Sequence, residues 1–140
     1  MDKDRILHSY GVANKMVEIG KLLKLDNNLL DDLFIIGINH DIGCEFDKNN
    51  HAVVGGNKLK EVGFKYYKEV YYHGRIQDEY NSLYLDILNM ADMMIDKYGN
   101  DVGYDKRLKD IESRYGNDNA IYKRCLELVD YLRNKYKEIS

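Results

Sequence analysis

A histidine and an aspartate stand side by side at the end of an apolar segment, within residues 37–43 (GINHDIG). The preceding residues 33–36 are Leu, Phe, Ile and Ile, so the doublet lies where a buried helix is expected to end. A buried imidazole or carboxylate costs free energy unless it is hydrogen-bonded or bound to a metal ion. The chain must therefore fold so that other groups reach His40 and Asp41, and we expect these two residues to hold a metal.

Apolar residues recur at helical spacing along the whole chain. This spacing predicts helices over residues 4–24, 27–39, 51–62, 64–72, 81–97, 105–115 and 119–138, with a polar loop over 44–50. Proline, the main helix breaker, is absent, and no segment shows the sustained alternation typical of a strand. We predict an all-α fold, a single-domain helical bundle of about six to seven helices over residues 1–140. The motifs lie in a core of about 4–97, and the C-terminal helices over about 104–139 are expected to close one side of the bundle without contributing chemistry.

Two adjacent glycines, Gly55 and Gly56, fall inside the helix predicted over 51–62. Glycine within a helix costs about 1 kcal/mol relative to alanine. Such a pair is tolerated where another element must approach closely, so we expect a neighbouring helix or the metal site against it.

Charge and composition exclude several classes of protein. The formal net charge is -3 and the basic residues are scattered, which argues against a broad nucleic-acid surface. No apolar run approaches the roughly 20 residues that span a bilayer, and the charged N-terminus does not resemble a signal peptide. Cys44 and Cys125 lie far apart without a CxxC motif, so we expect reduced thiols and a cytoplasmic protein. The charge leaves room for a small local basic patch that binds phosphates, and a homodimer is the protein–protein arrangement we consider.

Four histidines and two aspartates in apolar surroundings form an ordered set along the chain. The successive members are His8, His40, Asp41, His51, His73 and Asp92. Their spacings are too long for a zinc finger and include no HExxH motif, whereas ligands on facing helices of a bundle suit them. His8 taken alone is typical of a hydrogen-bonded core residue, but the whole set uses every histidine in the chain and predicts a metal centre.

This order of motifs resembles the HD superfamily of metal-dependent phosphohydrolases, over residues 5 to about 96. Residues 5–9 (RILHS) resemble the opening RxxHS motif of the family, and 40–43 (HDIG) resemble its defining doublet. Residues 51–56 (HAVVGG) and 72–74 (YHG) resemble the segments that carry two additional histidines in two-metal members. Residues 91–93 (ADM) resemble the closing AD motif.

The resemblance implies an HD-type bundle with two metal ions. His8, His40, Asp41 and Asp92 would bind the first ion, and Asp41 would bridge to a second ion held by His51 and His73. Imidazole and carboxylate ligands suit iron, which is expected first, or manganese, nickel or zinc. Two such ions can share a bridging hydroxide for attack on a phosphate, which makes Asp41 the expected catalytic residue.

The expected substrate contacts are basic residues near these motifs. The resemblance implies that Arg5 contacts a phosphate or orients a ligand, and Lys58 and Arg75 are further candidates because they lie near the proposed ligands in sequence. Family members often carry a lysine or glutamate three residues after the aspartate of the doublet. Here that residue is Cys44, to which we assign no catalytic role.

The implied activity is hydrolysis of a nucleotide, a dinucleoside polyphosphate or another small phosphoester. The motifs are most similar to small bacterial hydrolases of symmetrical dinucleoside tetraphosphates, although the ten-residue gap from Asp41 to His51 is shorter than in that group. The same ligand set resembles mixed-valent di-iron oxygenases, which depend on a lysine that Cys44 replaces. A non-catalytic nucleotide-binding module that retains its metal is the third alternative.

Overall fold

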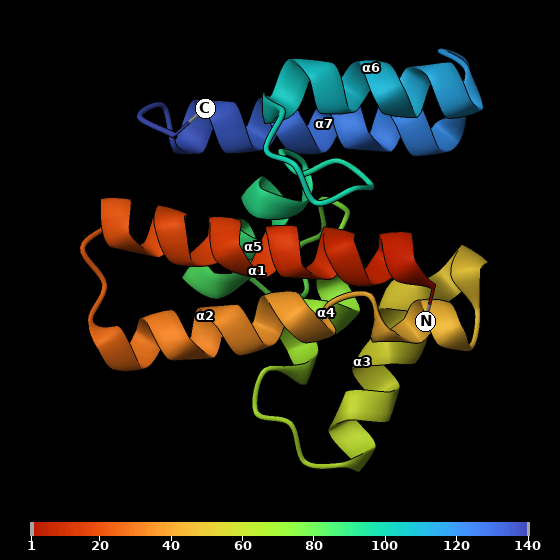
Figure 1. Cartoon of the computed structure of the whole chain (residues 1–140). Helices are drawn as coiled ribbons and strands as arrows, with labels where there is room; N and C mark the ends of the chain where they lie inside the picture. The colour runs from red at the N-terminus through yellow and green to blue at the C-terminus, as the bar shows by residue number, and fades with distance from the viewer. Residues whose placement is uncertain (1, 140) are drawn as a thin grey trace.

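The computed structural model describes residues 2–139, and these form an all-α bundle, as the sequence predicts (Figure 1). Within this range lie seven α-helices and two short 3₁₀ helices, and the only extended pairing is an isolated bridge between Ile95 and Asp101. The elements are α1 (Lys3–Leu22), α2 (Asn27–Asn39), η1 (Ile42–Glu45), η2 (Lys48–Asn50), α3 (His51–Glu61), α4 (Tyr67–Tyr72), α5 (Leu83–Asp92), α6 (Gly103–Tyr115) and α7 (Ala120–Lys135).

Most helices lie where the periodicity predicts them, and α2 has the predicted bounds. The loop predicted over 44–50 is wrong in detail, because η1 and η2 occupy most of it. Helices α4 and α5 are shorter than predicted, since polar and glycine-containing turns surround them. Residues 81 and 82 are predicted to be helical but precede α5, because Ser82 caps this helix. The Ser82 side chain accepts a hydrogen bond from the Leu85 amide at 3.0 Å.

Helices α1 and α2 form an antiparallel pair along one side of the molecule (Figure 1). A glycine sets how closely they approach: a Cβ atom at Gly37 would lie 2.5 Å from the Cα atom of Ala13. This close contact near the end of α2 brings the doublet that follows it toward the first turns of α1. The rings of His8 and His40 are consequently 5.3 Å apart, centroid to centroid.

Helix α5 passes through the centre of the bundle, and residues 85–91 are all buried. A helix that is buried on every side must satisfy its polar side chains internally. Asn89 does so by accepting a hydrogen bond from the Gly74 amide at 2.8 Å, which fixes the turn that follows His73. Asp86 accepts from Lys135 at 2.9 Å and from the Tyr136 hydroxyl at 2.6 Å, which holds the end of α7 against α5.

The adjacent glycines of α3 face two different neighbours, as close approach predicts. A Cβ atom at Gly55 would lie 3.0 Å from the Gly43 nitrogen in η1, beside the histidine–aspartate doublet. A Cβ atom at Gly56 would lie 2.5 Å from that of Tyr71 in α4. Helix α3 therefore packs directly on the segment that carries the doublet and on α4.

Helices α6 and α7 lie together above α1 and α5 and close that side of the bundle (Figure 1). Their inward faces belong to the hydrophobic core, through residues such as Tyr104, Leu108, Leu128 and Leu132. In the described part of the chain, no helix combines the length and the apolar character that crossing a bilayer requires.

Candidate metal centre

The six candidate ligands come from five helices and converge at one point. His8 lies in the second turn of α1, and Asp92 is the last residue of α5. His40 and Asp41 follow α2, His51 begins α3, and His73 follows α4. Neighbouring imidazole rings lie 5.2 to 5.3 Å apart in the order His8, His40, His73, His51. Segments that are distant in the sequence thus place all four histidines of the chain in one cluster.

Asp41 lies between two pairs of histidines. Its Oδ2 atom is 3.3 Å from Nε2 of His40 and 3.7 Å from Nε2 of His8. Its Oδ1 atom is 3.3 Å from Nε2 of His51 and 3.8 Å from Nε2 of His73. The two oxygens of one buried carboxylate therefore face different halves of the cluster.

Asp92 completes only one of these halves. Its Oδ1 atom is 2.9 Å from Nε2 of His8 and 3.4 Å from Nε2 of His40. Atoms that share a metal ion at about 2.1 Å lie roughly 3 to 3.5 Å from one another. Most of the distances in the cluster fall in or near this range, so the side chains need little movement to reach a common ion.

The other nitrogen of each ring, Nδ1, faces a backbone carbonyl oxygen. The partners are Gly37 for His40 at 2.7 Å, Val70 for His73 at 2.6 Å, Asp96 for His8 at 2.9 Å and Lys48 for His51 at 3.4 Å. For three of the rings the partner lies three residues earlier, at the end of a helix or turn, and the Gly37 and Val70 carbonyls also accept the backbone amide of His40 and of His73.

These carbonyl contacts assign the tautomers. A carbonyl oxygen only accepts, so Nδ1 carries a hydrogen, and the Nε2 atom that faces Asp41 and Asp92 is left to bind a proton or a metal ion. The Nε2 atoms of His40 and His73 are buried and have no hydrogen-bond partner among residues 2–139. Lone pairs that face carboxylates repel them unless a proton or a metal ion lies between. The arrangement, in which a backbone group orients the outer nitrogen of each histidine, is that of metal-binding histidines.

The electrostatics of the cluster also favour a cation. Burial opposes the charge of His40, but the adjacent Asp41 and Asp92 hold the pKa of this imidazole well above its usual value. Burial likewise opposes ionisation of both carboxyl groups, yet the surrounding histidines hold the pKa of Asp41 and that of Asp92 well below the usual range. Both carboxylates are thus charged at neutral pH and attract a positive ion to the space between the rings.

His51 and Cys44 lie on the more open side. Burial and the neighbouring His73 lower the pKa of His51, so its ring is neutral and available as a ligand at pH 7. Burial and the Asp41 carboxylate raise the pKa of the Cys44 thiol to about 12. The sulfur lies within 4.8 Å of ligand atoms of both Asp41 and His51, but the group is protonated at neutral pH and cannot act as a base.

A cavity of about 950 Å³ opens from the cluster to the surface. Arg5 lines it and donates a hydrogen bond from Nη1 to Oδ2 of Asp41 at 3.3 Å. Arg75 lines it as well, with its Nη1 bonded to the Tyr71 carbonyl at 2.9 Å and its guanidinium over the rings of Tyr71 and Tyr72. Two of the three basic residues chosen from the sequence therefore lie where a ligand at the cluster can reach them.

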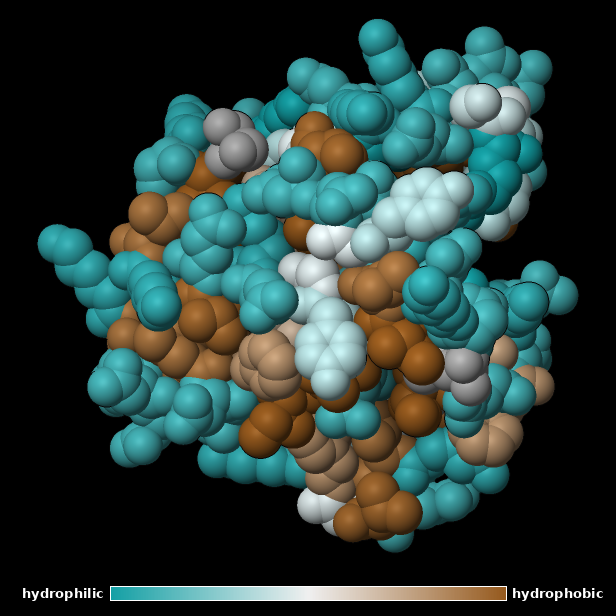
Figure 2. Space-filling model, viewed as in Figure 1, coloured by the Kyte–Doolittle hydropathy of each residue, from teal (hydrophilic) through white to brown (hydrophobic). Residues whose placement is uncertain are grey.

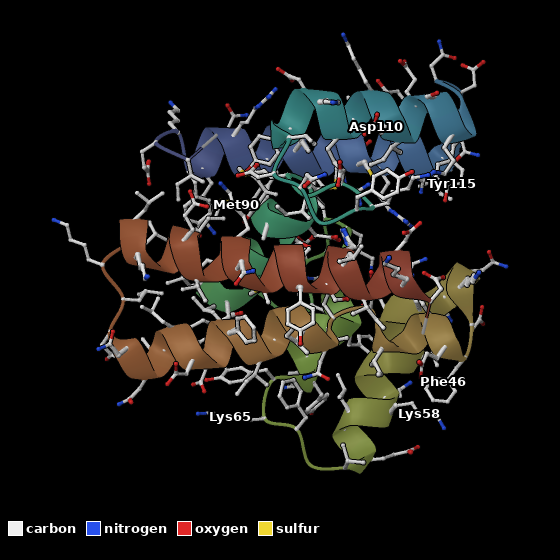
Figure 3. All side chains as sticks on the ribbon, viewed as in Figure 1. Phe46, Lys58, Lys65, Met90, Asp110 and Tyr115 are labelled. Atoms are coloured by element: carbon white, nitrogen blue, oxygen red, sulfur yellow. The ribbon has the colours of Figure 1, made fainter. Side chains whose placement is uncertain are left out.

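Lys58 is the candidate that the structure does not bring to the cluster. It is exposed on α3 and does not line the cavity; its ammonium group lies 5.0 Å from the centre of the Phe46 ring (Figure 3). Its position in the sequence misleads because His51 begins α3, whereas Lys58 lies two turns later on the outer face.

Substitution of Lys58 tests this correction. We expect Lys58→Ala to retain the wild-type metal content and to change any turnover by less than about twofold, because an exposed cation–π contact contributes only about 0.5–1 kcal/mol to stability. Metal analysis and initial rates measure this. A large increase in KM would show that Lys58 reaches the substrate after all.

The sequence prediction missed the contribution of the C-terminal helices. Arg107, Arg114 and Arg124 all line the cavity, and Arg107 donates from Nε to the Asp92 carbonyl at 3.2 Å. The sequence shows no candidate residue after Gly99, whereas the structure places three arginines of this region on the cavity wall. The basic residues recur at helical spacing on α6, but only the packing of that helix shows that this face covers the cluster.

Comparison with known proteins agrees with the geometry. A family model described as HD domain matches residues 5–135. No curated protein and no solved structure is significantly similar to the chain. The match extends beyond the motif-bearing core and includes all of α6 and α7, so the C-terminal helices belong to the same domain as the cluster.

Proposed function

The chain belongs to the HD domain family, and from this premise we propose that it is a metal-dependent phosphohydrolase. The proposed ligands are His8, His40, Asp92 and Oδ2 of Asp41 for one ion, and His51, His73 and Oδ1 of Asp41 for a second. The observation that carries the proposal is the orientation of the four rings. Each has its outer nitrogen on a backbone carbonyl and its inner nitrogen, Nε2, toward the carboxylates.

The mixed imidazole and carboxylate ligands support a divalent transition metal, with iron first and manganese, nickel or zinc as alternatives. Bound ions of this kind supply a hydroxide at neutral pH and neutralise the charge of a phosphate under attack. Asp41 fixes the two halves of the centre relative to each other. The carbonyl partners hold the imidazoles in one tautomer and orientation, which reduces the reorganisation that binding requires.

Arg5 and Arg75 are the proposed phosphate contacts. Burial opposes the charge of Arg5, but Asp41 raises the pKa of its guanidinium, which stays charged beside the cluster. Its remaining N–H groups can donate to a phosphate oxygen in the cavity. The proposed substrate is a nucleotide, a dinucleoside polyphosphate or another small phosphoester, in the cytoplasm.

Cys44 affects the ranking of the alternatives. The di-iron oxygenases that this ligand set resembles depend on a lysine near the doublet, and here that position holds a protonated, half-buried thiol. Hydrolysis depends less on a cation at this position, since the proposed ions and Arg5 already supply positive charge. We therefore place hydrolysis before oxygenation.

A substrate panel tests the proposal. Protein purified without chelators is expected to contain one to two equivalents of transition metal and, with Mn²⁺ or Fe²⁺, to release phosphate or nucleotide from at least one substrate class. The panel contains nucleotides, dinucleoside polyphosphates and phosphomonoesters, with His40→Ala protein as the blank. Metal without turnover would favour the binding module, oxygen uptake would favour the oxygenase, and protein without metal would contradict the centre itself.

A further inference from the structure

The cavity beside the cluster has one wall formed by α6 and α7. Residues at helical spacing on α6, namely 107, 111, 114 and 115, line it together with 121, 124 and 125 of α7. The space-filling view shows the molecule hollowed between this helix pair and the helices below it (Figure 2). Tyr115 marks the outer end of the wall, on the side of α6 and α7 that faces α1 (Figure 3).

Positive charge is concentrated around this cavity, although the chain as a whole carries a net charge of -3. Eight of the 21 basic residues line it, against four acidic residues, two of which are the proposed ligands Asp41 and Asp92. Such a concentration in a concave region attracts anions and raises their local concentration.

The arginines on the wall differ in their contacts. Arg107 donates a hydrogen bond to the Asp92 carbonyl and so lies next to the cluster. Arg114 and Arg124 are exposed and have no acidic side chain within 4 Å among residues 2–139, and the guanidinium group of Arg114 lies 5.9 Å from the centre of the Tyr115 ring. Two guanidinium groups that line a cavity without a carboxylate partner are available to a ligand.

The spacing of the arginines along α6 shows how far the cavity wall extends from the cluster. Arg114 follows Arg107 by seven residues, so its Cα atom lies about 10 Å further along the helix, on the same face. A ligand that contacts both the cluster and Arg114 must therefore be extended. An arginine fork pairs well with phosphate oxygens, often through two hydrogen bonds.

We propose that Arg114 and Arg124 form a second anion subsite, which binds the distal part of a phosphate chain whose terminal phosphoryl group lies at the metal centre. The proposal rests on the proposed hydrolase function and narrows its substrate class to oligophosphates, organic or inorganic, rather than phosphomonoesters. Arg107 lies between the metal centre and this subsite, and in the proposed complex it contacts the middle of the phosphate chain.

A charge-matched pair of double variants tests the subsite. Arg114→Gln/Arg124→Gln removes two positive charges from the wall, and Lys109→Gln/Lys123→Gln removes two from exposed positions of the same helices that do not line the cavity. Calorimetry then compares the binding of inorganic tripolyphosphate with that of orthophosphate to the protein as purified. Metal content is measured before and after each titration, because tripolyphosphate also chelates metal, and thermal unfolding checks that both variants fold.

The arginine variant is expected to lose on the order of 2- to 30-fold in affinity for tripolyphosphate, since each exposed guanidinium–phosphate contact contributes up to about a factor of five. Its ratio of tripolyphosphate to orthophosphate affinity should fall, while the lysine variant keeps the wild-type ratio. Equal weakening in both variants, or no weakening in either, would overturn the subsite. If the arginine variant loses tripolyphosphate binding but the wild-type protein turns over no substrate of the panel, the subsite stands and the hydrolase proposal is contradicted. If the wild-type protein turns over a substrate but the arginine variant binds tripolyphosphate as well as the wild type does, the hydrolase proposal stands and the subsite is contradicted.

Discussion

Asp41→Asn protein is expected to contain less than a tenth of the wild-type metal and to hydrolyse its substrate at least about 10³-fold more slowly. The physical reason is the position of the carboxylate between two pairs of histidines, with one oxygen toward each pair. An amide of the same shape replaces one of these oxygens by an NH₂ group, which has no lone pair to offer a metal, and it removes the negative charge that attracts the ion.

Two single-ligand variants distinguish a bridging role from an ordinary one. His8→Ala removes a ligand from the half that contains Asp92, and His51→Ala removes one from the opposite half. If Asp41 joins the halves, each histidine variant should lose about one equivalent of metal, whereas Asp41→Asn should lose both. Element analysis of protein prepared without chelators gives these values directly.

Asp4→Asn is the matched control, because Asp4 also lines the cavity but is exposed and forms no ion pair with a histidine within residues 2–139. It is expected to keep its metal. Circular dichroism of the metal-free proteins shows whether a loss of metal reflects a loss of fold. Asp41→Asn protein that folds and still contains two equivalents would contradict the bridge.

The fold was largely predictable because it depends on patterns within single helices, and the cluster because its members stand in the order that the HD family shows. Apolar spacing defines α2 to the residue, and the ordered set that uses every histidine names the side chains that the structure brings together. The carbonyl partners of the rings were not predicted, although a histidine that directly follows a helix is a recognisable signal for His40 and His73. Such a residue can fold back on the last carbonyl groups of the helix.

The sequence does not predict the positions of residues that depend on how helices pack. Lys58 is near His51 in sequence, but two turns of α3 carry it to the outer face. Arg114 and Arg124 are distant from every motif in sequence, yet the packing of α6 and α7 on the bundle places them on the cavity wall. Periodicity shows which residues share a face of a helix, but it does not show what that face covers.

Gly43→Ala should be the most damaging of the single-methyl substitutions near the centre. The added Cβ atom would overlap the carbonyl oxygen of His51 and lie 2.7 Å from the amide nitrogen of Gly55. Both are backbone atoms of α3, so no side-chain rotation relieves the overlap and η1 must move away from α3. Asp41 precedes η1 and His51 begins α3, so this movement separates two of the proposed ligands.

We expect Gly43→Ala to lower the free energy of unfolding by about 3 kcal/mol, at the upper end for overpacking, and to lose most of the metal held by the half that contains His51. Gly63→Ala is the control, since a Cβ atom there meets nothing within 4 Å and the residue has a φ of +80°. It should lose only the roughly 1–2 kcal/mol that a left-handed backbone costs a residue other than glycine, and it should keep its metal. Urea unfolding with and without added metal separates the two contributions, because an ion that binds only the folded protein adds stability by mass action. Equal stability and equal metal content in the two variants would show that η1 and α3 can separate without disturbing the centre, and that the contact at Gly43 does not position Asp41.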